Sequence, residues 1–384
     1  MSRPFLRLYK DDIIISMRTI QGMIFTIKDG FVPGIVSIDD GIIKGVEFFS
    51  DEKLASDQRK KYVIPGLIDM HMHGCISFDT CDASYESLKH MAEYERECGI
   101  TSFCPTSMTL PKEKLIDICH CIRNGVEKIS GIVGLYLEGP FICEKKAGAQ
   151  DRRHIIKPDK ELFDLLYKES GENIKVVAIA PETEGAIDFI ASNKDRVICS
   201  IAHTMSDYRQ TIEAIDAGAR HATHLYNGMR RTDHRDPGCV EAVMDRNEVF
   251  AELICDMKHI HPAVIRNAFK TLGDDRIILI SDSMEAAGMP DGEYELGGQK
   301  VFKKGKSAIL SDGTLAGSVC NLFDCMINAI KAGISFESAI KAATVNPAIA
   351  LGIFDRVGSI DAGKKADIVI MDDRLDIIEV ITQS

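Results

Sequence analysis

Histidines and a glutamate spread through the chain have the types and the order of a hydrolytic metal site. His71 and His73 are separated by one residue, and on a strand both would point to the same side and reach one ion. Farther along stand one carboxylate and two imidazoles, those of Glu138, His203 and His224. These are the ligands of zinc-type hydrolytic centres, which leave one coordination position open for water.

Asp282 adds a second carboxylate to this set. A bound divalent ion lowers the pKa of its water to roughly 7 and polarises a carbonyl under attack. A neighbouring carboxylate then acts as the general base and afterwards protonates the leaving nitrogen. The combination predicts hydrolysis of an amide, with Asp282 as the catalytic acid and base.

The elements that must bring these residues together begin at Tyr62, where short apolar runs alternate with amphipathic helical stretches. Eight runs are typical of strands: Tyr62–His71, Ile100–Pro105, Ile132–Glu138, Ile174–Pro181, Val197–His203, His221–Leu225, Val249–Asp256 and Ile277–Asp282. Eight βα repeats favour an α/β fold of the TIM (β/α)8 barrel type over the alternative, a doubly wound sheet. A Gly-rich stretch after the last run, Met289–Lys306, predicts a hairpin insertion.

The candidate residues stand at the ends of the first, third, fifth, sixth and eighth of these strands. A single histidine in such a place is more often a hydrogen-bonded structural residue. The joint occurrence of the set, in order, at the end of the barrel where active sites are built indicates a metal centre instead.

The ends of the chain have a different texture. Ile13–Ile20, Met23–Lys28, Gly34–Ile38 and Ile42–Phe48 are β-rich, and Asp-Gly pairs at 29–30 and 40–41 predict hairpin turns between them. Gly358–Val380 is again β-rich but too short to fold alone. We expect residues 1–62 and 349–384 to form a small β-sandwich domain beside a barrel of residues 63–348.

Composition limits the function classes. The chain has 46 lysine and arginine residues against 58 aspartate and glutamate residues, a net charge of -12, so a nucleic-acid partner is not expected. No run of about 20 apolar residues and no secretory signal is seen, so no membrane partner is expected. The 12 scattered cysteines favour free thiols in a reducing compartment, and the cytoplasm is the expected location.

Several segments, taken together, resemble those of the N-acetylglucosamine-6-phosphate deacetylases, within the amidohydrolase superfamily. They are PGLIDMHMHG (65–74), LYLEGPF (135–141), HTMSD (203–207), ATHLYNGM (222–229), SDSMEAAGMPDGEYELGG (281–298), LSDGTLAGS (310–318) and VGSIDAGKKADIVIMD (357–372). The resemblance runs from about residue 34 to the end. It implies hydrolysis of N-acetyl-D-glucosamine 6-phosphate to D-glucosamine 6-phosphate and acetate.

The resemblance also implies roles for single residues. Glu138, His203 and His224 match primary metal ligands, and Asp282 matches the catalytic acid/base. Residues that match substrate contacts are Ala149, Gln150, Asn227, Gly228, His259, Leu315, Ala316 and Gly317. Arg235 matches an arginine that a neighbouring subunit lends to the phosphate, which implies a homodimer.

At three positions the chain departs from the commonest pattern of the family. Gln150 stands where a histidine is frequent, and Gly228 replaces a usual alanine. Met257 replaces the glycine of a segment that usually has the pattern Asp-Gly-x-His. The presence of both His71 and His73 leaves open whether one or two metal ions bind per chain. The ligands suit Zn, Fe, Co or Mn. Two alternatives to the activity stay open: deacetylation of another N-acetyl-hexosamine phosphate, such as the galacto epimer, and a catalytically silent sugar-phosphate-binding barrel.

Overall fold

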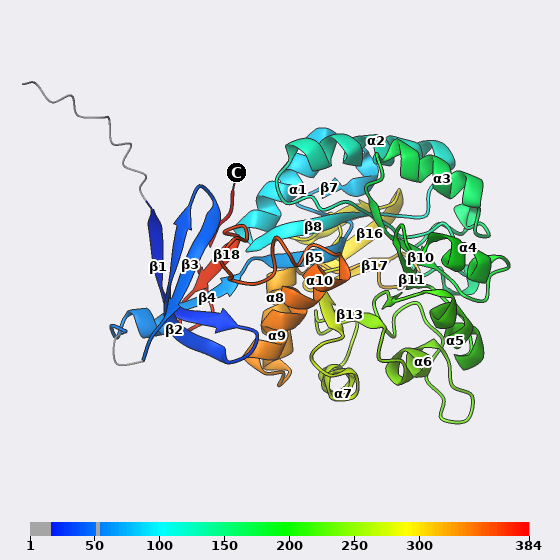
Figure 1. Ribbon diagram of the computed structural model, residues 1–384. Coiled ribbons are helices and arrows are strands. Elements are labelled where there is room, and N and C mark those ends of the chain that lie inside the picture. Colours follow the sequence, from blue (N-terminus) through cyan, green and yellow to red (C-terminus); the bar gives the residue numbers. More distant parts are fainter. Residues whose placement is uncertain (1–16, 51–53, 384) are drawn as a thin grey trace, which may run out of the picture.

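A computed structural model describes residues 17–50 and 54–383. Eight parallel strands pair in chain order and helices surround them (Figure 1). The strands are β5 (Leu67–Met72), β8 (Ile100–Ser107), β9 (Leu135–Leu137), β10 (Ile174–Ile179), β11 (Ile198–Ile201), β12 (His221–Ala222), β13 (Phe250–Ile254) and β14 (Ile277–Ile280). The Asp282 N–H donates to the His71 carbonyl at 3.0 Å, which brings the last strand beside the first. The expected (β/α)8 barrel is confirmed.

The outer helices follow from periodicity and capping. They are α1 (Tyr85–Glu97), α2 (Lys112–Lys128), α3 (Lys160–Glu169), α4 (Ala186–Asn193), α5 (Tyr208–Ala217), α6 (Cys239–Asp245), α7 (Pro262–Leu272), α8 (Leu322–Lys331), α9 (Phe336–Ala343) and α10 (Val345–Ala350). Asp207 illustrates the capping: its carboxylate accepts from the Gln210 N–H, and the Gln210 side chain accepts from the Asp207 N–H. The helices bury one apolar face against strands that are apolar on both faces, such as β14.

The segment expected as one strand, Tyr62–His71, is two strands in two different sheets. β4 (Tyr62–Pro65) pairs with the terminal strands and β5 with the barrel. The chain changes sheet at Gly66, where a Cβ would lie 2.1 Å from Thr101 Oγ1. Apolar residues on both sides of this glycine hide the change from any periodicity argument.

The terminal strands form one six-stranded sheet in the order β19-β18-β4-β1-β2-β3. Its other members are β1 (Arg18–Thr26), β2 (Gly30–Asp39), β3 (Ile42–Phe48), β18 (Ile368–Met371) and β19 (Ile377–Ile381). Both Asp-Gly turns are present, joining β1 to β2 and β2 to β3. The C-terminal strands thus complete the N-terminal unit, as expected, and the barrel stands beside it (Figure 1).

One detail of the terminal sheet differs from expectation. Ile13–Ile20 and Met23–Lys28 were expected as separate strands, but β1 runs unbroken from Arg18 to Thr26, and residues 13–16 lie outside the described residues. Gln21 and Gly22 read as a break in sequence, yet both pair with β2. The exact domain boundaries at 62 and 348 stay a prediction.

The insertion after β14 is a three-stranded sheet, not a hairpin. β15 (Gly292–Leu296), β16 (Gln299–Lys304) and β17 (Ser307–Leu310) pair in order. A cluster that includes Leu296 and Val301 from the insertion and Met108 from the barrel is buried. The insertion therefore covers part of the carboxyl end of the barrel.

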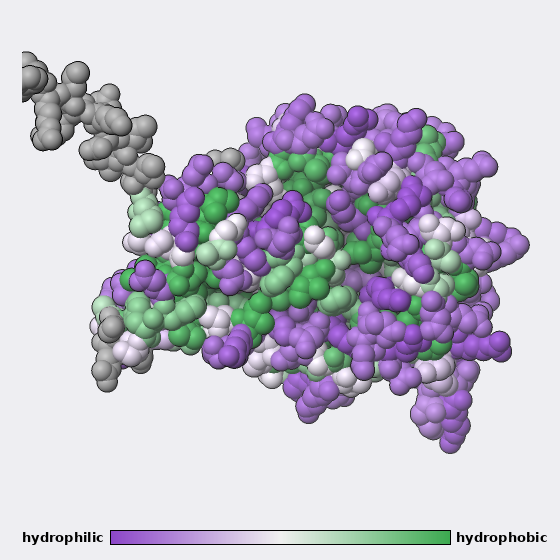
Figure 2. Space-filling model, in the orientation of Figure 1, coloured by the Kyte–Doolittle hydropathy of each residue, from purple (hydrophilic) through white to green (hydrophobic). Residues whose placement is uncertain are grey.

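Hydrophilic side chains dominate the face over the barrel helices, and apolar residues gather towards the terminal sheet (Figure 2). Met17, Ile27, Phe48 and Ile378 are exposed apolar residues of that sheet or its edges. In the described part of the chain, no helix combines the length and apolarity needed to cross a membrane.

Candidate active site

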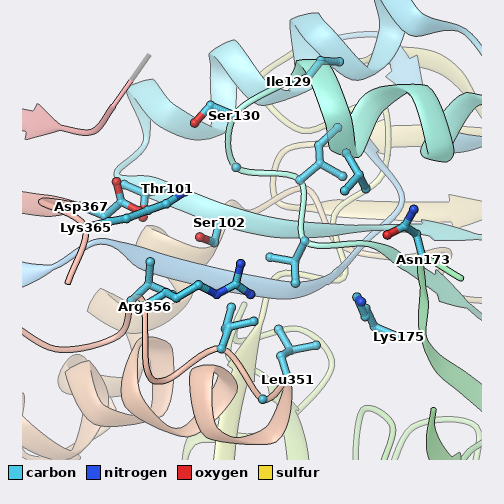
Figure 3. A pocket seen from close by; sticks show the side chains of 17 residues that line it. Thr101, Ser102, Ile129, Ser130, Asn173, Lys175, Leu351, Arg356, Lys365 and Asp367 are labelled. Atoms are coloured by element: carbon cyan, nitrogen blue, oxygen red, sulfur yellow. The ribbon is translucent and has the colours of Figure 1, made fainter. Parts of the chain in front are cut away.

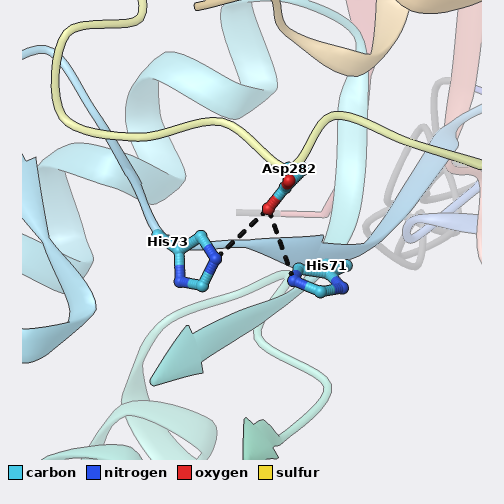
Figure 4. Close-up of side chains that lie close together, drawn as sticks. All are labelled: His71, His73 and Asp282. Atoms are coloured by element: carbon cyan, nitrogen blue, oxygen red, sulfur yellow. Dashed lines mark ion pairs between the residues drawn. The ribbon is translucent and has the colours of Figure 1, made fainter. Parts of the chain in front are cut away.

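Six of the residues selected from sequence meet where the barrel strands end. They form two groups whose ligand atoms lie within 4.8 Å of one another: Glu138 with His203 and His224, and His71 with His73 and Asp282. Figure 4 shows His71 and His73 converging on Asp282, whose Oδ1 lies 3.4 Å and 3.2 Å from their Nε2 atoms. All six are buried.

Glu138 connects the two groups. Its Oε1 lies 2.9 Å from His224 Nε2 and 3.1 Å from His203 Nε2. Its Oε2 lies 3.3 Å from His73 Nε2, and its Oε1 lies 3.6 Å from His71 Nε2. The glutamate therefore sits between all four imidazoles and connects the two groups.

The second nitrogen of each ring is fixed by a hydrogen bond on the outer side. His203 Nδ1 donates to the Lys146 carbonyl at 2.7 Å, His224 Nδ1 to the Asn227 carbonyl at 3.1 Å and His73 Nδ1 to the Thr106 carbonyl at 3.2 Å. A carbonyl can only accept, so each Nδ1 carries its proton and each Nε2 faces inward. Outer partners that set the tautomer in this way are usual for histidines that bind metals.

His71 is held by a charged partner. Its Nδ1 lies 3.0 Å from Glu252 Oε2, and Glu252 Oε1 lies 2.9 Å from His221 Nε2. The same carboxylate accepts the backbone N–H of His224 at 3.1 Å. Glu252, which is fully buried, thus ties the β5 histidine to the β12 histidine.

The pKa shifts in this cluster follow from the attraction between its carboxylates and imidazoles. Burial opposes ionisation of Glu138, but the charge of His71 and hydrogen bonds from the other imidazoles hold its pKa well below the usual range. The pKa of Asp282 is lowered in the same way against burial, by His73 and then His71. Burial would lower the pKa of His203, and Glu138 raises it instead.

The donor set fits divalent metal. His203 Nε2 and His224 Nε2 lie 3.2 Å apart and both face Glu138 Oε1. Two imidazole lone pairs at that separation repel one another unless a proton or a cation lies between them. A divalent cation supplies that charge to neutral imidazoles and releases their protons, which is how metal affinity couples to pH.

The backbone at the site is unusual. His203, His224 and Asp282 have φ values of 41°, 29° and 49°, in the left-handed region that non-glycine residues seldom occupy. Each follows directly on a short barrel strand or its extension. The turn redirects these side chains from the strand direction into the shared centre.

A pocket of about 240 Å³ opens over this centre. Of the residues expected to contact a substrate, it is lined by Ala149, Gln150, Asn227, Gly228, His259, Leu315 and Gly317. Ala316, also expected there, is instead fully buried in the apolar cluster under the insertion. Its neighbours on either side face the pocket, so the loop position is right but that side chain points away.

Arg235 is not brought to the pocket of its own chain. It lies in an exposed loop before α6, where its N–H donates to Asp233 Oδ1 at 2.9 Å. This loop projects away from the barrel body (Figure 1). The expectation that Arg235 acts on a neighbouring subunit stays a prediction.

Gln150 and His259 are both oriented by carboxylates. Gln150 Nε2 donates to Glu138 Oε2 at 2.6 Å, and its Oε1 accepts the Thr109 N–H at 2.6 Å. His259 Nδ1 lies 2.8 Å from Asp256 Oδ2. The amide of Gln150 therefore positions Glu138 at the pocket wall, and Asp256 leaves His259 Nε2 as its inward atom.

The structure explains how the chain accommodates the other two departures from the family pattern, Met257 and Gly228. Met257 has φ 64°, the conformation a glycine adopts freely, and the turn is retained because Asp256 Oδ1 accepts the N–H groups of Lys258 and His259. At Gly228, with φ 61°, a Cβ would lie 3.0 Å from His203 Nδ1. The glycine leaves room for His203 that the usual alanine would restrict.

Sequence reasoning missed Glu252, the partner of His71. The signal was present, since Glu252 is the one charged residue in the strand Phe250–Ile254, which is otherwise apolar. A carboxylate inside a strand buried on both faces requires a partner, and that requirement points to a functional or structural network. Met108 and Leu296, apolar residues of the pocket wall, carried no such signal.

Comparison with known proteins places this geometry among hydrolases. The amidohydrolase family model matches residues 62–384. The N-acetylglucosamine-6-phosphate deacetylase of Bacillus subtilis is 38% identical over 365 residues, 91% of each chain. The N-acetylgalactosamine-6-phosphate deacetylase of Escherichia coli O157:H7 is 33% identical over 353 residues, 90% of this chain and 92% of the relative.

Solved structures agree. A mutant N-acetyl-D-glucosamine-6-phosphate deacetylase from Mycobacterium smegmatis, in complex with N-acetyl-D-glucosamine-6-phosphate, superposes with a TM-score of 0.90 at 29% identity, covering 96% of this chain and 98% of that one. The N-acetylglucosamine-6-phosphate deacetylase from Thermotoga maritima gives a TM-score of 0.87 at 28% identity, covering 95% and 98%.

Proposed function

From the premise that the chain belongs to the amidohydrolase family, we propose that it hydrolyses N-acetyl-D-glucosamine 6-phosphate to D-glucosamine 6-phosphate and acetate. The observation that carries the proposal is the inward convergence of four imidazole Nε2 atoms on Glu138 and Asp282. Relatives and solved structures named for this activity support the substrate.

Metal would be held by the two groups that meet at Glu138. Glu138, His203 and His224 form the first set, and His71, His73 and Asp282 the second. An ion bound there supplies a Lewis acid that polarises the acetyl carbonyl and lowers the pKa of the attacking water. Zn, Fe, Co and Mn all suit imidazole and carboxylate ligands.

Asp282 moves the proton. Its lowered pKa keeps the carboxylate ionised near neutral pH, so it accepts a proton as water oxygen bonds to the acetyl carbon. When the C–N bond breaks, the same carboxyl returns a proton to the leaving nitrogen. Acetic acid and a free amine result, the acid loses its proton to solvent at neutral pH to give acetate, and Asp282 is ionised again.

The pocket wall would hold the sugar. Asn227, Gly228 and His259 line the pocket together with Leu315 and Gly317. Arg235, on its projecting loop, is proposed to reach the phosphate of a substrate bound to a second copy of the chain. The remote phosphate would then position the amide for attack, which lowers the barrier through orientation.

The epimer is a second candidate substrate. The relative named N-acetylgalactosamine-6-phosphate deacetylase covers 90% of this chain at 33% identity, close to the values for the gluco enzymes. We place the enzyme in the cytoplasm, because all twelve cysteines are unpaired among the described residues and free thiols suit a reducing compartment.

The test is a deacetylation assay on both epimeric N-acetyl-hexosamine 6-phosphates, with metal content measured on the same sample. The proposal requires release of acetate from the gluco substrate at the higher kcat/KM. Failure to release acetate from either substrate, in a sample that contains metal, would refute it.

The number of ions is tested by measuring metal in wild type and in the His71→Ala, His73→Ala double variant. A two-ion centre predicts two ions in wild type and one in the variant. Equal stoichiometry in the two proteins would reduce these histidines to a supporting role.

A further inference from the structure

A second cavity, of about 420 Å³, lies at the opposite end of the barrel from the active site. Its wall is made where β8 and β10 begin, from the loop before β9, and from the end of α10 and the segment that leads to β18 (Figure 3). Nothing in the proposed reaction uses this region. Its volume is within the range of small-molecule sites.

Three cations line this cavity, and they come from three separate segments: Lys175 on β10, Arg356 after α10 and Lys365 before β18. In Figure 3, Arg356 reaches beneath Ser102, and Lys175 approaches from the opposite side. Among the residues that the structure describes, Lys175 and Lys365 form no ion pair, and Arg356 has only a 3.9 Å approach to its neighbour Asp355. These cations give the cavity local positive charge in a chain whose net charge is -12.

One carboxylate, that of Asp367, also lines the wall. Its Oδ1 accepts from Thr382 Oγ1 at 2.6 Å, and it lies in no ion pair with the three cations. Burial raises the pKa of Asp367, against the opposing effects of Thr382 and Lys365. It therefore offsets only part of the positive charge.

Neutral donors complete the lining. Ser102 is 6% exposed and its hydroxyl has no hydrogen-bond partner within the described chain. Thr101 Oγ1 is also buried without a partner there. Leu351, Ile353 and Val357 add apolar surface to the lining. A cavity lined by cations, hydroxyls and apolar side chains suits an anionic group attached to a small organic body.

We propose that this cavity binds a phosphorylated small molecule through its phosphate group. Three cations on separate segments match a group with two negative charges and several acceptor oxygens, and arginine and lysine are the usual phosphate ligands. The cavity is partly open to solvent, and its volume of about 420 Å³ fits a small molecule better than an extended polymer. The proposal does not depend on the identity of the substrate at the other end.

The binding test is equilibrium dialysis of the purified enzyme with inorganic phosphate and, separately, with glucosamine 6-phosphate. The Lys175→Ala, Arg356→Ala double variant is expected to bind one ligand fewer per chain than wild type. Lys128→Ala, which removes an exposed lysine of α2 outside the cavity, is the matched control and should bind as wild type does. Tighter binding of glucosamine 6-phosphate than of phosphate identifies a sugar phosphate as the ligand; equal binding identifies free phosphate.

Equal stoichiometry in wild type and the double variant would overturn the proposal. Lys365→Gln guards against a folding defect, because Lys365 is exposed, and it should weaken binding at this site by about tenfold. Crystals soaked in tungstate give an independent readout. An anomalous peak between Lys175 and Arg356 supports the site, and a peak confined to the active-site pocket refutes it.

Discussion

The two ends of the barrel use polar residues in opposite ways. At the carboxyl end, four imidazoles and two carboxylates are buried, and each imidazole is held on its outer side by a carbonyl or by Glu252. At the amino end, three cations line a larger cavity, and their one ion pair in the described chain is the 3.9 Å approach of Arg356 to Asp355. Chemistry at the first end requires fixed positions, whereas capture of an anion at the second requires only accessible charge.

The backbone repeats the contrast. His203, His224 and Asp282 have positive φ values just beyond their strands. Thr101, Ser102 and Lys175 lie within regular strands, β8 and β10. The same barrel therefore has left-handed turns after the carboxyl ends of its strands and regular strand backbone at their amino ends. Substitutions at the two ends should therefore differ in kind and in the size of their effect.

The largest effect is expected for His203→Ala or His224→Ala. Loss of one ligand from a three-ligand set should remove most of the bound metal and reduce turnover to background. Metal analysis and the acetate-release assay measure both. His120→Ala, which changes an exposed histidine paired with Glu169 on the barrel surface, should keep metal and rate. Full metal and full rate in the His203 variant would make it a structural residue.

Asp282→Asn should cut kcat by at least ~10²-fold, because general acid–base catalysis is worth about that much. The amide keeps the shape of the side chain, so metal at the Glu138, His203 and His224 set should remain. Single-turnover kinetics and metal analysis on one sample separate these outcomes. A near-normal kcat would remove Asp282 from the mechanism.

Arg235→Ala should lower kcat/KM for the phosphorylated sugar by about 1.5–3 kcal/mol, the value of a charge-assisted contact. Unphosphorylated N-acetylglucosamine should be affected far less. Arg231→Ala, on the same exposed loop, is the control and should change neither substrate. An equal loss on both substrates would contradict phosphate recognition.

The proposal that Arg235 acts on the active site of a second subunit can be tested separately. Mixing Arg235→Ala chains with Asp282→Asn chains should restore some activity, because one active site of the hybrid dimer would have both groups. If subunit exchange is confirmed and no activity returns, Arg235 does not act across subunits.

Glu252→Gln should reduce metal affinity or turnover by roughly 10–100-fold, as loss of an outer partner of a metal-binding histidine does. Its pKa is lowered, against burial, by His71 and His221, so the substitution removes a charge. Glu95→Gln is the matched control. Glu95 is also buried, but burial and the charge of Asp69 raise its pKa well above the usual range, so little charge is lost. Similar losses in the two variants would show that burial alone, not the imidazole pairing, matters at Glu252.

The smallest effect is expected at the amino end. The Lys175→Ala, Arg356→Ala double variant should keep kcat/KM within about twofold of wild type when no phosphate is added, as surface substitutions usually do. A large fall in rate without ligand would mean that the two ends are not independent.

Sequence alone indicated the fold and most of the site, for a physical reason. Candidate ligands such as His203 and Asp282 closely follow apolar strands, and parallel strands bring their carboxyl ends together whatever lies between them. Glu252 escaped because its partners, His71 and His221, are distant in sequence and become neighbours only when the barrel closes. Gly66, where the chain changes sheet, escaped because the reason for the glycine is the approach of Thr101.

The direction of individual side chains could also not be predicted from the sequence. Ala316 and Gly317 are adjacent, yet only Gly317 lines the pocket. Loop direction depends on the strands β15, β16 and β17, one of which was not predicted. The cations of the second cavity were not selected at all, because Lys175, Arg356 and Lys365 share no motif or spacing.

The left-handed turns at His203, His224 and Asp282 also bear on how the enzyme should respond to selection for heat resistance. Residues in sparsely populated backbone conformations cost of order 1–3 kcal/mol each, and glycine relieves that cost. A library screened only for survival at high temperature should therefore enrich glycine or asparagine at these positions and return proteins that melt later and no longer turn over. At these three residues a gain in thermal stability is expected to cost turnover. Substitutions that raise stability without loss of activity have to be sought elsewhere in the chain.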